Sequence, residues 1–274
     1  MEDRSVSVVA RRLVGLYFGK RVSRGAASMS FFLLLTVFPL LICLNGMLGS
    51  LFPTTERFEA LARGLLPQQT LSAVSDYLRY IGRNSGRGML TAGIALMCSS
   101  TAAAFRATLG VMADLRGRPR FKPLQSLPLS FLLSLVFLAV MYFAALVVLL
   151  GERLLTELAL HFAFIDPDSL WPALRYPLLF LLVFLTLWGL YRVTSPPRSR
   201  CGLAWGALAA AAGIEALSAV FSAFIGMSAR YALVYGSLTS LVMLMLWLYF
   251  CCTLVILGGA LNIILQNTAQ KKLA

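Results

Sequence analysis

Hydrophobic residues in this chain are gathered into six long runs that are separated by shorter polar segments. The runs lie near residues 28–52, 89–112, 127–150, 172–190, 202–225 and 236–265. Each run has close to 20 residues or more, the length a helix needs to cross about 30 Å of hydrocarbon at about 1.5 Å per residue. We therefore expect an all-α, polytopic membrane bundle of six transmembrane helices over residues 28–265. It forms a single integral membrane domain, residues 1–274.

Shorter amphipathic patterns predict helices outside these runs. Residues 5–22 place Val6, Val9 and Leu13 against basic side chains, which is typical of a helix lying in the membrane interface. It falls in an N-terminal segment, 1–25. Two further helical patterns fall in the long outside segment, 53–88. We expect those two helices to cover the bundle or to rest on the outer leaflet.

The basic residues are unevenly divided between the two sides of the membrane. Segments on the side of the N-terminus hold 15 of the 24 Lys and Arg, and the opposite segments hold eight. The positive-inside rule then predicts that both ends are cytoplasmic, including a tail at 266–274. The net charge of +13 needs no nucleic acid to explain it, because anionic lipid headgroups attract such segments. We expect anionic membrane lipids as partners and no nucleic acid.

Composition argues against a soluble fold and gives little support to catalysis. Hydrophobic residues make up 59% of the chain and charged residues 13%, far from soluble averages. The single histidine, His161, lies near Glu157, Asp166 and Asp168, but one histidine among acids is a weak metal-site signal. No hydrolase elbow, zinc-protease pair or phosphate loop is present. We therefore expect no enzyme activity, no metal site and no cofactor.

Two ionisable residues lie inside predicted spans, Arg106 in the second and Glu215 in the fifth. Charges at this depth are costly unless they pair or face a water-filled cavity. Arg106 and Glu215 are therefore the leading candidates either for a substrate path or for a structural ion pair. A direct pair between them would satisfy both charges, and either role is compatible with the sequence.

Five further residues are candidates for lining a polar cavity: Pro39, Asn45, Ser99, Ser100 and Asn262. Pro39 removes a backbone hydrogen bond inside the first span and is expected to kink it. Asn262 follows Gly258 and Gly259, so that it also fits an interhelical contact made by small residues.

Four stretches of the sequence resemble a known family. They are AASMSFFLLLTVFPLL at 26–41, RGRPRFK at 116–122, YRVTSP at 191–196 followed by GALAAAAGIEAL at 206–217, and YGSLTSLVMLMLWLY at 235–249 running on to LGGALN. In this order and spacing the chain resembles the YihY/BrkB family of bacterial inner-membrane proteins over essentially its whole length.

The resemblance implies six spans in the bacterial cytoplasmic (inner) membrane with both ends in the cytoplasm. Glu215 matches an acid common in that helix of the family, whereas Ala260 stands where the family usually has a second acid. The name ribonuclease BN has travelled with the family, but the sequence offers no nuclease chemistry. Some relatives have been linked to the movement of lipid material, which implies transport or translocation of a lipid or another anionic amphiphile for the cell envelope.

Two readings of function remain open at this stage. A translocase predicts a polar cavity in which Arg106 attracts a headgroup and Glu215 balances or gates it. A structural or assembly protein of the envelope, without transport activity, predicts a closed bundle with a sealed ion pair and a protein partner at residues 53–88. The sequence fixes neither the substrate nor the oligomeric state.

Overall fold

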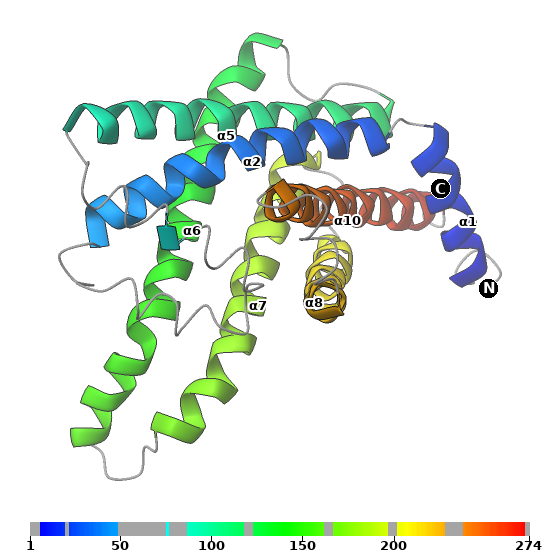
Figure 1. Cartoon of the computed structure of the whole chain (residues 1–274). Coiled ribbons are helices and arrows are strands. Elements are labelled where there is room, and N and C mark those ends of the chain that lie inside the picture. The colour runs from blue at the N-terminus through cyan, green and yellow to red at the C-terminus, as the bar shows by residue number, and fades with distance from the viewer. Residues whose placement is uncertain are drawn as a thin grey trace.

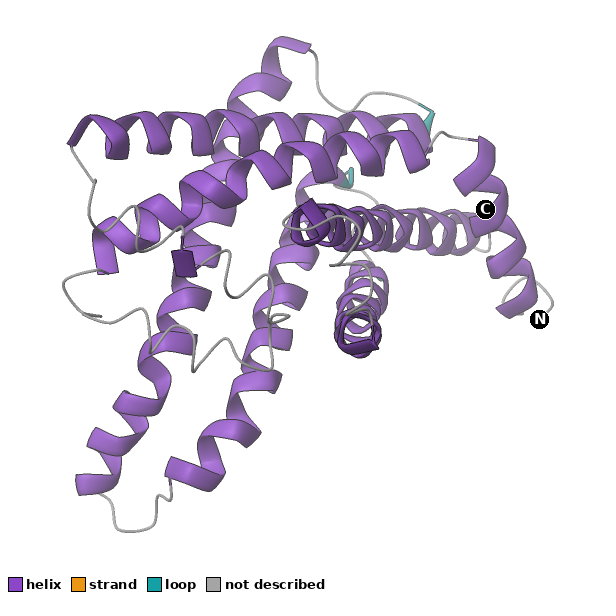
Figure 2. Cartoon of the chain, in the orientation of Figure 1, coloured by secondary structure: helices purple, strands orange, loops and turns teal. Residues whose placement is uncertain are grey.

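The computed structural model describes residues 6–19, 22–48, 75–76, 87–117, 123–161, 167–196, 202–227 and 238–271. All regular structure in this part of the chain is helical (Figure 2). The helices are α1 (Val6–Gly19), α2 (Val22–Leu48), α5 (Arg87–Arg116), α6 (Pro123–His161), α7 (Pro167–Thr194), α8 (Leu203–Met227) and α10 (Leu238–Lys271). The predicted all-α class is confirmed.

Six of these helices are long and apolar enough to cross a membrane. The spans within them are Val22–Leu41, Thr91–Arg116, Gln125–Val147, Ala173–Thr194, Leu203–Ala223 and Leu241–Asn267. Each overlaps one predicted run, which confirms six spans. The first span begins at Val22 and not near residue 28, because Val22 and Ala26 are buried against neighbouring helices although polar Ser23 and Arg24 lie between them.

Two helices extend beyond the ends of the runs predicted from the sequence. α5 ends at Arg116 because Gly117 adopts a left-handed backbone conformation, with a φ of 73°. α6 continues to His161, well beyond the predicted end of its run at residue 150. Beyond that point it still packs on α7, since a Cβ at Gly151 would overlap the buried indole of Trp171. The absence of a side chain at Gly151 thus keeps the two helices in contact.

The helices form two groups that cross each other (Figure 1). α2 and α5 lie side by side and make the most extensive contact in the molecule, and α10 packs against both α2 and α8. α6 and α7 run together and cross the first group, with α6 contacting α5 and α7 contacting α8. α5 and α8 lie on opposite sides of α10 and do not pack extensively on each other.

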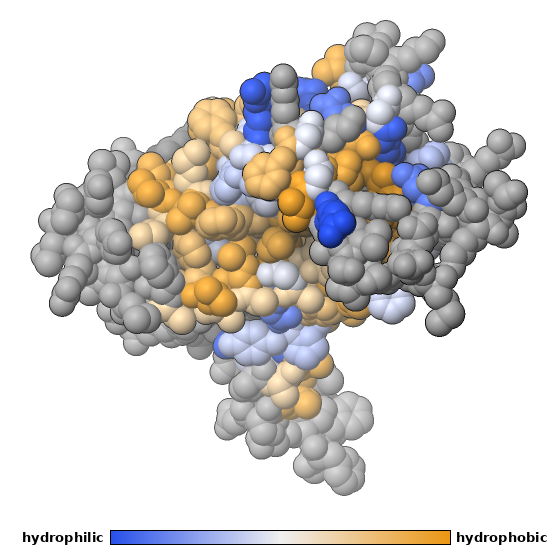
Figure 3. Space-filling model, turned by 90° about the vertical axis from the view of Figure 1, so that its right-hand side faces the viewer, coloured by the Kyte–Doolittle hydropathy of each residue, from blue (hydrophilic) through white to orange (hydrophobic). Residues whose placement is uncertain are grey.

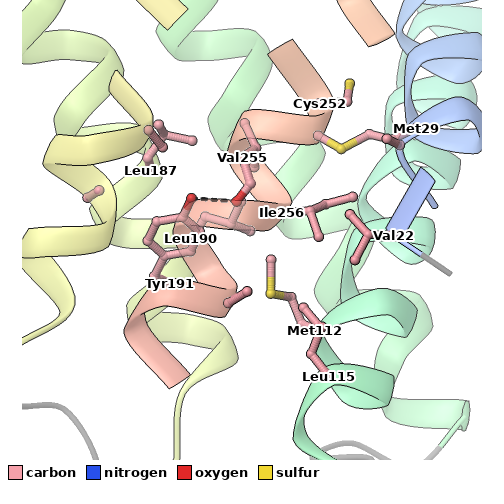
Figure 4. Close-up of a cluster of buried hydrophobic side chains, with 14 of the residues drawn as sticks. Val22, Met29, Met112, Leu115, Leu187, Leu190, Tyr191, Cys252, Val255 and Ile256 are labelled. Atoms are coloured by element: carbon pink, nitrogen blue, oxygen red, sulfur yellow. Dashed lines mark hydrogen bonds between the residues drawn. The ribbon is translucent and has the colours of Figure 1, made fainter. Parts of the chain in front are cut away.

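The main hydrophobic core lies where α2, α5, α7, α8 and α10 converge (Figure 4). Val22, Met112 and Ile256 are almost completely buried there. The hydroxyl of Tyr191 donates a hydrogen bond of 2.6 Å to the carbonyl oxygen of Val255, which joins α7 to α10. Since this hydroxyl is buried, the bond satisfies a donor that would otherwise be costly in an apolar interior.

α1 is the amphipathic helix expected from the N-terminal pattern. Leu13, Leu16 and Tyr17 pack against the core, whereas Val14 and Phe18 are 56% and 78% exposed. A hydrogen bond with Tyr249 of α10 raises the pKa of the Tyr17 phenol. The exposed apolar face suits a helix that lies against the hydrocarbon boundary.

Of the segment 53–88, only Ser75, Asp76, Arg87 and Gly88 are among the described residues. Ser75 and Asp76 are helical and fall within the second predicted pattern, and the rest of the two predicted helices lies outside the described residues. Elsewhere the spans show an outward surface suited to lipid. Figure 3 shows a broad apolar area on one face of the molecule, with hydrophilic side chains grouped beside it. On α6, exposed Phe131, Leu132 and Val136 are side chains typical of lipid contact.

Candidate functional site

Arg106 and Glu215 are the two charges that lie well inside the observed spans, and both are on the outer surface of the helix bundle. Arg106 is exposed on α5, and Glu215 is exposed on α8. Arg106 is ten residues, about 15 Å, from the end of α5, and Glu215 is 12 residues, about 18 Å, from the start of α8. Both side chains are therefore placed at the level of hydrocarbon, where a charged group costs about 2.5–3.5 kcal/mol.

The structure does not bring Arg106 and Glu215 together within one chain. Their helices lie on opposite sides of α10, and no ion pair or hydrogen bond joins either side chain to the described residues. The sealed intramolecular pair that the sequence allowed is thus absent from this part of the chain. Each charge needs a partner from outside: water, a lipid headgroup or another protein surface.

The surface around Arg106 is unlike a lipid-facing surface. Between residues 97 and 117 of α5, the exposed residues are Ser99, Arg106, Gly110, Asp114 and Gly117, none of them a large apolar residue. Ser99 donates a hydrogen bond of 3.0 Å to the carbonyl oxygen of Leu96 in its own helix. This set of five residues, the α5 stripe, presents small and polar groups along the half of the span nearer the C-terminal end of α5.

Glu215 lies among small exposed residues on α8. Ala212, Ala216, Ala219 and Ser222 are exposed around it, at the spacing that places residues on one side of a helix. These residues and Glu215 form the α8 stripe. α8 also exposes the large apolar side chains Trp205, Leu208 and Val220, so Glu215 lies in a surface that mixes small and large apolar residues.

Ser100 belongs to a buried hydroxyl cluster between α2 and α5. Its Oγ lies 2.9 Å from Oγ1 of Thr36, which also lies 3.2 Å from Oγ1 of Thr101. Thr36 and Thr101 were not singled out by sequence reasoning, because a hydroxyl in an apolar run does not reveal which helix it faces. The cluster joins α2 to α5, and the Ser100 side chain lies in the contact between these two helices.

Pro39 and Asn45 both lie in α2. Pro39 is buried, and the helix continues past it to Leu48. Its ring nitrogen cannot donate to the carbonyl oxygen of Leu35, so one backbone acceptor is released at this point. The side chain of Asn45 lies outside the described residues. The predicted cavity role of both residues stays a prediction.

Asn262 fastens α10 to the first turn of α8. Its Oδ1 accepts a hydrogen bond of 2.9 Å from the backbone N–H of Gly206, and its Nδ2 donates one of 3.0 Å to the carbonyl oxygen of Leu203. The side chain is 1% exposed. Both contacts fall on the first turn of α8, so this one amide holds the start of α8 against α10. Asn262 thus makes the interhelical contact that the sequence also allowed.

The C-terminal end of α5 is joined to the end of α7 by a second polar contact. Arg116 donates a hydrogen bond of 2.8 Å to the hydroxyl oxygen of Ser195, just after the end of α7. Two polar contacts thus join stretches far apart in the chain, Arg116 with Ser195 and Gly206 with Asn262.

Comparison with known proteins agrees with this architecture. The family described as virulence factor BrkB matches residues 15–274. The chain belongs to this family. No solved structure matches it.

Several BrkB relatives cover nearly the whole chain. The ribonuclease-like protein YfkH of Bacillus subtilis (strain 168) is 29% identical over 263 residues, with 90% of each protein covered. A UPF0761 membrane protein of Chromobacterium violaceum is 31% identical over 271 residues, which cover 92% of this chain and 59% of that protein. The UPF0761 membrane protein NMB0524 of Neisseria meningitidis serogroup B is 27% identical over 266 residues, 95% of this chain and 63% of that protein. The chain therefore spans about three fifths of the length of these longer relatives.

Membership of the BrkB family makes this a membrane protein whose family has no settled function. The described residues hold no group of three or more His, Cys, Asp or Glu side chains that would suit a metal ion. The side chains of His161 and Asp168, and the whole of Asp166, lie outside the described residues. At Ala260 the resemblance implies an acid. Ala260 lies on α10 and is completely buried in the protein.

Proposed function

We propose that this protein moves a lipid or another anionic amphiphile across or along the bacterial inner membrane, with Arg106 on the substrate path. The observation that carries the proposal is the exposure of Arg106 on the α5 stripe at membrane depth. A sealed ion pair would have favoured a purely structural role, and the described residues contain no such pair for Arg106 or Glu215.

The chemistry of the α5 stripe suits a headgroup whose tails stay in the bilayer. A guanidinium can give a phosphate or carboxylate two parallel hydrogen bonds, which are stronger than those between neutral groups. Ser99 and Gly110, on either side of Arg106, leave room for a headgroup because their side chains are small. The tails would remain beside the large apolar residues of neighbouring surfaces. Glu215 would balance or gate the positive charge from α8.

The proposal includes the orientation predicted from the basic residues. The start of α2 and the ends of α5 and α10 then lie on the cytoplasmic side, where anionic headgroups are attracted to α1 and its neighbours. A substrate that enters from the cytoplasmic leaflet would meet the α5 stripe about 15 Å below the end of the helix, at Arg106.

Native mass spectrometry in a mild detergent tests the proposal. Wild type, Arg106→Ala and Glu215→Ala are purified from the same membranes, and the lipids that remain bound are identified. Arg192→Ala is the matched control, because Arg192 is an exposed arginine two residues from the end of α7. We expect selective retention of an anionic lipid by wild type and by the control, and its loss in Arg106→Ala.

Equal and unselective lipid in all four well-folded proteins would contradict the proposal. It would favour the envelope assembly role, and a search for a protein partner at residues 53–88 would then follow.

A further inference from the structure

One buried amide of this protein lacks a hydrogen-bond partner. Gln266, on α10, is only 8% exposed, and its Nε2 atom is shielded from solvent. Among the residues that the structure describes, no acceptor receives a hydrogen bond from this atom. A buried donor without a partner has lost its bonds to water and gained nothing in return, and native interiors contain few such groups. The amide of Gln266 therefore indicates a partner from outside the chain.

Gln266 lies beside the N-terminal end of α8. The contacts between α10 and α8 are, in order, Leu254 with Gly213, Gly258 with Gly206, and Asn262 with Leu203. Residue numbers thus rise along α10 as they fall along α8. Gln266 is one helical turn beyond Asn262 on the same side of α10. The order of contacts therefore places its side chain at the start of α8.

The start of α8 offers further hydrogen-bond donors. This helix of 25 residues begins at Leu203. The N–H groups of the first helical turn, here those of Leu203 and Ala204, have no partner within a helix. They lie at the positive end of the helix dipole, which is a favourable place for an anion. The amide of Gln266 and these N–H groups can therefore donate to one bound anion.

A guanidinium lies at the same end of the bundle. Met112 of α5 and Tyr191 of α7 both lie against Gly259 of α10. In Figure 4 the labelled residues of α5, α7 and α10 descend in the view as their numbers rise, so these three helices run toward one end. One turn further along, Arg116 of α5 donates a hydrogen bond of 2.8 Å to the hydroxyl oxygen of Ser195. This bond holds the guanidinium where the three helices and the start of α8 converge.

The sequence adds positive charge next to this junction. Five basic residues follow the end of α5 or precede the start of α8: Arg118, Arg120, Lys122, Arg198 and Arg200. Within residues 110–123 and 190–205 the sequence has one acid, Asp114, which is exposed on α5. The net charge of these segments therefore favours an anionic ligand.

We propose that this junction binds a phosphate group, held by Nε2 of Gln266, by the N–H groups at the start of α8 and by Arg116. A phosphate suits donors that come from several helices, because it presents several oxygen acceptors and pairs strongly with arginine. The phosphate can belong to a lipid headgroup or to a free phosphate compound, which share this chemistry. The site goes beyond the proposed function, since Arg106 lies ten residues before the end of α5.

Thermal unfolding of the detergent-purified protein tests the site with two probes. Inorganic phosphate is compared with sodium chloride at equal ionic strength, and short-chain phosphatidylglycerol with short-chain diacylglycerol, which has no phosphate. A ligand that binds the folded state raises the unfolding midpoint. A rise with inorganic phosphate identifies a free phosphate ligand, and a rise with phosphatidylglycerol alone identifies a lipid. The proposal is overturned if neither probe raises the midpoint above that of its control.

Gln266→Met removes the amide donor and keeps a side chain of similar length. We expect the variant to need about tenfold or more of the effective probe for the same rise in midpoint. Without probe its midpoint should equal or exceed that of wild type, because an unsatisfied buried donor has been removed. Gln125→Met, at an exposed position of α6, is the matched control and should behave as wild type. A lower midpoint without probe, or an unchanged response to it, would contradict the role of Gln266.

Arg106→Ala separates this site from the proposed substrate path. A response to the probe that persists in Arg106→Ala and falls in Gln266→Met supports the junction site, whether or not the protein moves lipid. The reverse pattern would place the phosphate at Arg106 and overturn the proposal.

Discussion

At the residue scale, one buried amide holds the start of α8 to α10. Asn262 uses both its polar atoms on the first turn of α8, and neither atom reaches solvent because the side chain is 1% exposed. The sequence named this residue but could not choose between a cavity and a contact. That choice depends on which helix the residue faces, and the spacing of Gly258, Gly259 and Asn262 does not specify the facing helix.

Asn262→Ala should lower the stability of the folded bundle by about 1–2 kcal/mol, because two buried interhelical hydrogen bonds are lost. Thermal unfolding of the detergent-purified protein measures the change. Asn267→Ala, an exposed asparagine on the same helix, is the control and should leave the midpoint unchanged. Equal midpoints for both variants would show that the amide contributes little.

At the element scale, helix contacts in the core depend on the absence of side chains. α10 meets α7 and α8 at Gly258, where a Cβ would lie 2.6 Å from both the Gly206 carbonyl oxygen and the Tyr191 hydroxyl oxygen. The small-residue patterns in the sequence indicated close packing there. They could not indicate that similar residues on the other side of α8, around Glu215, remain exposed, because the rotation of a helix about its axis is set by its neighbours.

Gly258→Ala should force α10 away from α8 and Tyr191, since a methyl group has no room there. We expect a loss of about 1–3 kcal/mol, the usual effect of overpacking a core. Gly189→Ala adds the same methyl group at an open position and should be neutral or slightly stabilising. Chemical denaturation of both variants checks the difference, and a Gly258→Ala protein as stable as wild type would contradict the packing described.

At the scale of the whole molecule, the six spans were predictable and the position of the charges was not. The length of an apolar run is set by the thickness of the bilayer, so hydropathy placed all six spans near their observed positions. The early start of α2 at Val22 was missed because Ser23 and Arg24 interrupt the apolar pattern. For Arg106 and Glu215 the sequence left open an ion pair or a substrate path, because which face of a helix is covered is a tertiary property.

The orientation of the whole chain is tested by site-directed labelling in intact cells. With native cysteines removed, a cysteine at Arg24 or at Gly117 should react only after the cells are opened, whereas one at Gly88 should react with an impermeant maleimide from outside. Arg24, Gly88 and Gly117 are all exposed on the surface of the protein, so that the membrane alone decides which of them reacts. Labelling of Arg24→Cys by the impermeant maleimide in intact cells would contradict the predicted orientation.

Lipid movement in proteoliposomes tests the central claim most directly. Vesicles contain phosphatidylglycerol with a nitrobenzoxadiazole label, and external dithionite bleaches only the label that reaches the outer leaflet. We predict that the wild-type protein brings label from the inner to the outer leaflet, with or without an imposed proton gradient. The bleached fraction with Arg106→Ala should equal that of protein-free vesicles, and the bleached fraction with Arg192→Ala should equal that of wild type. Wild-type vesicles that bleach like protein-free vesicles under both conditions would contradict the account.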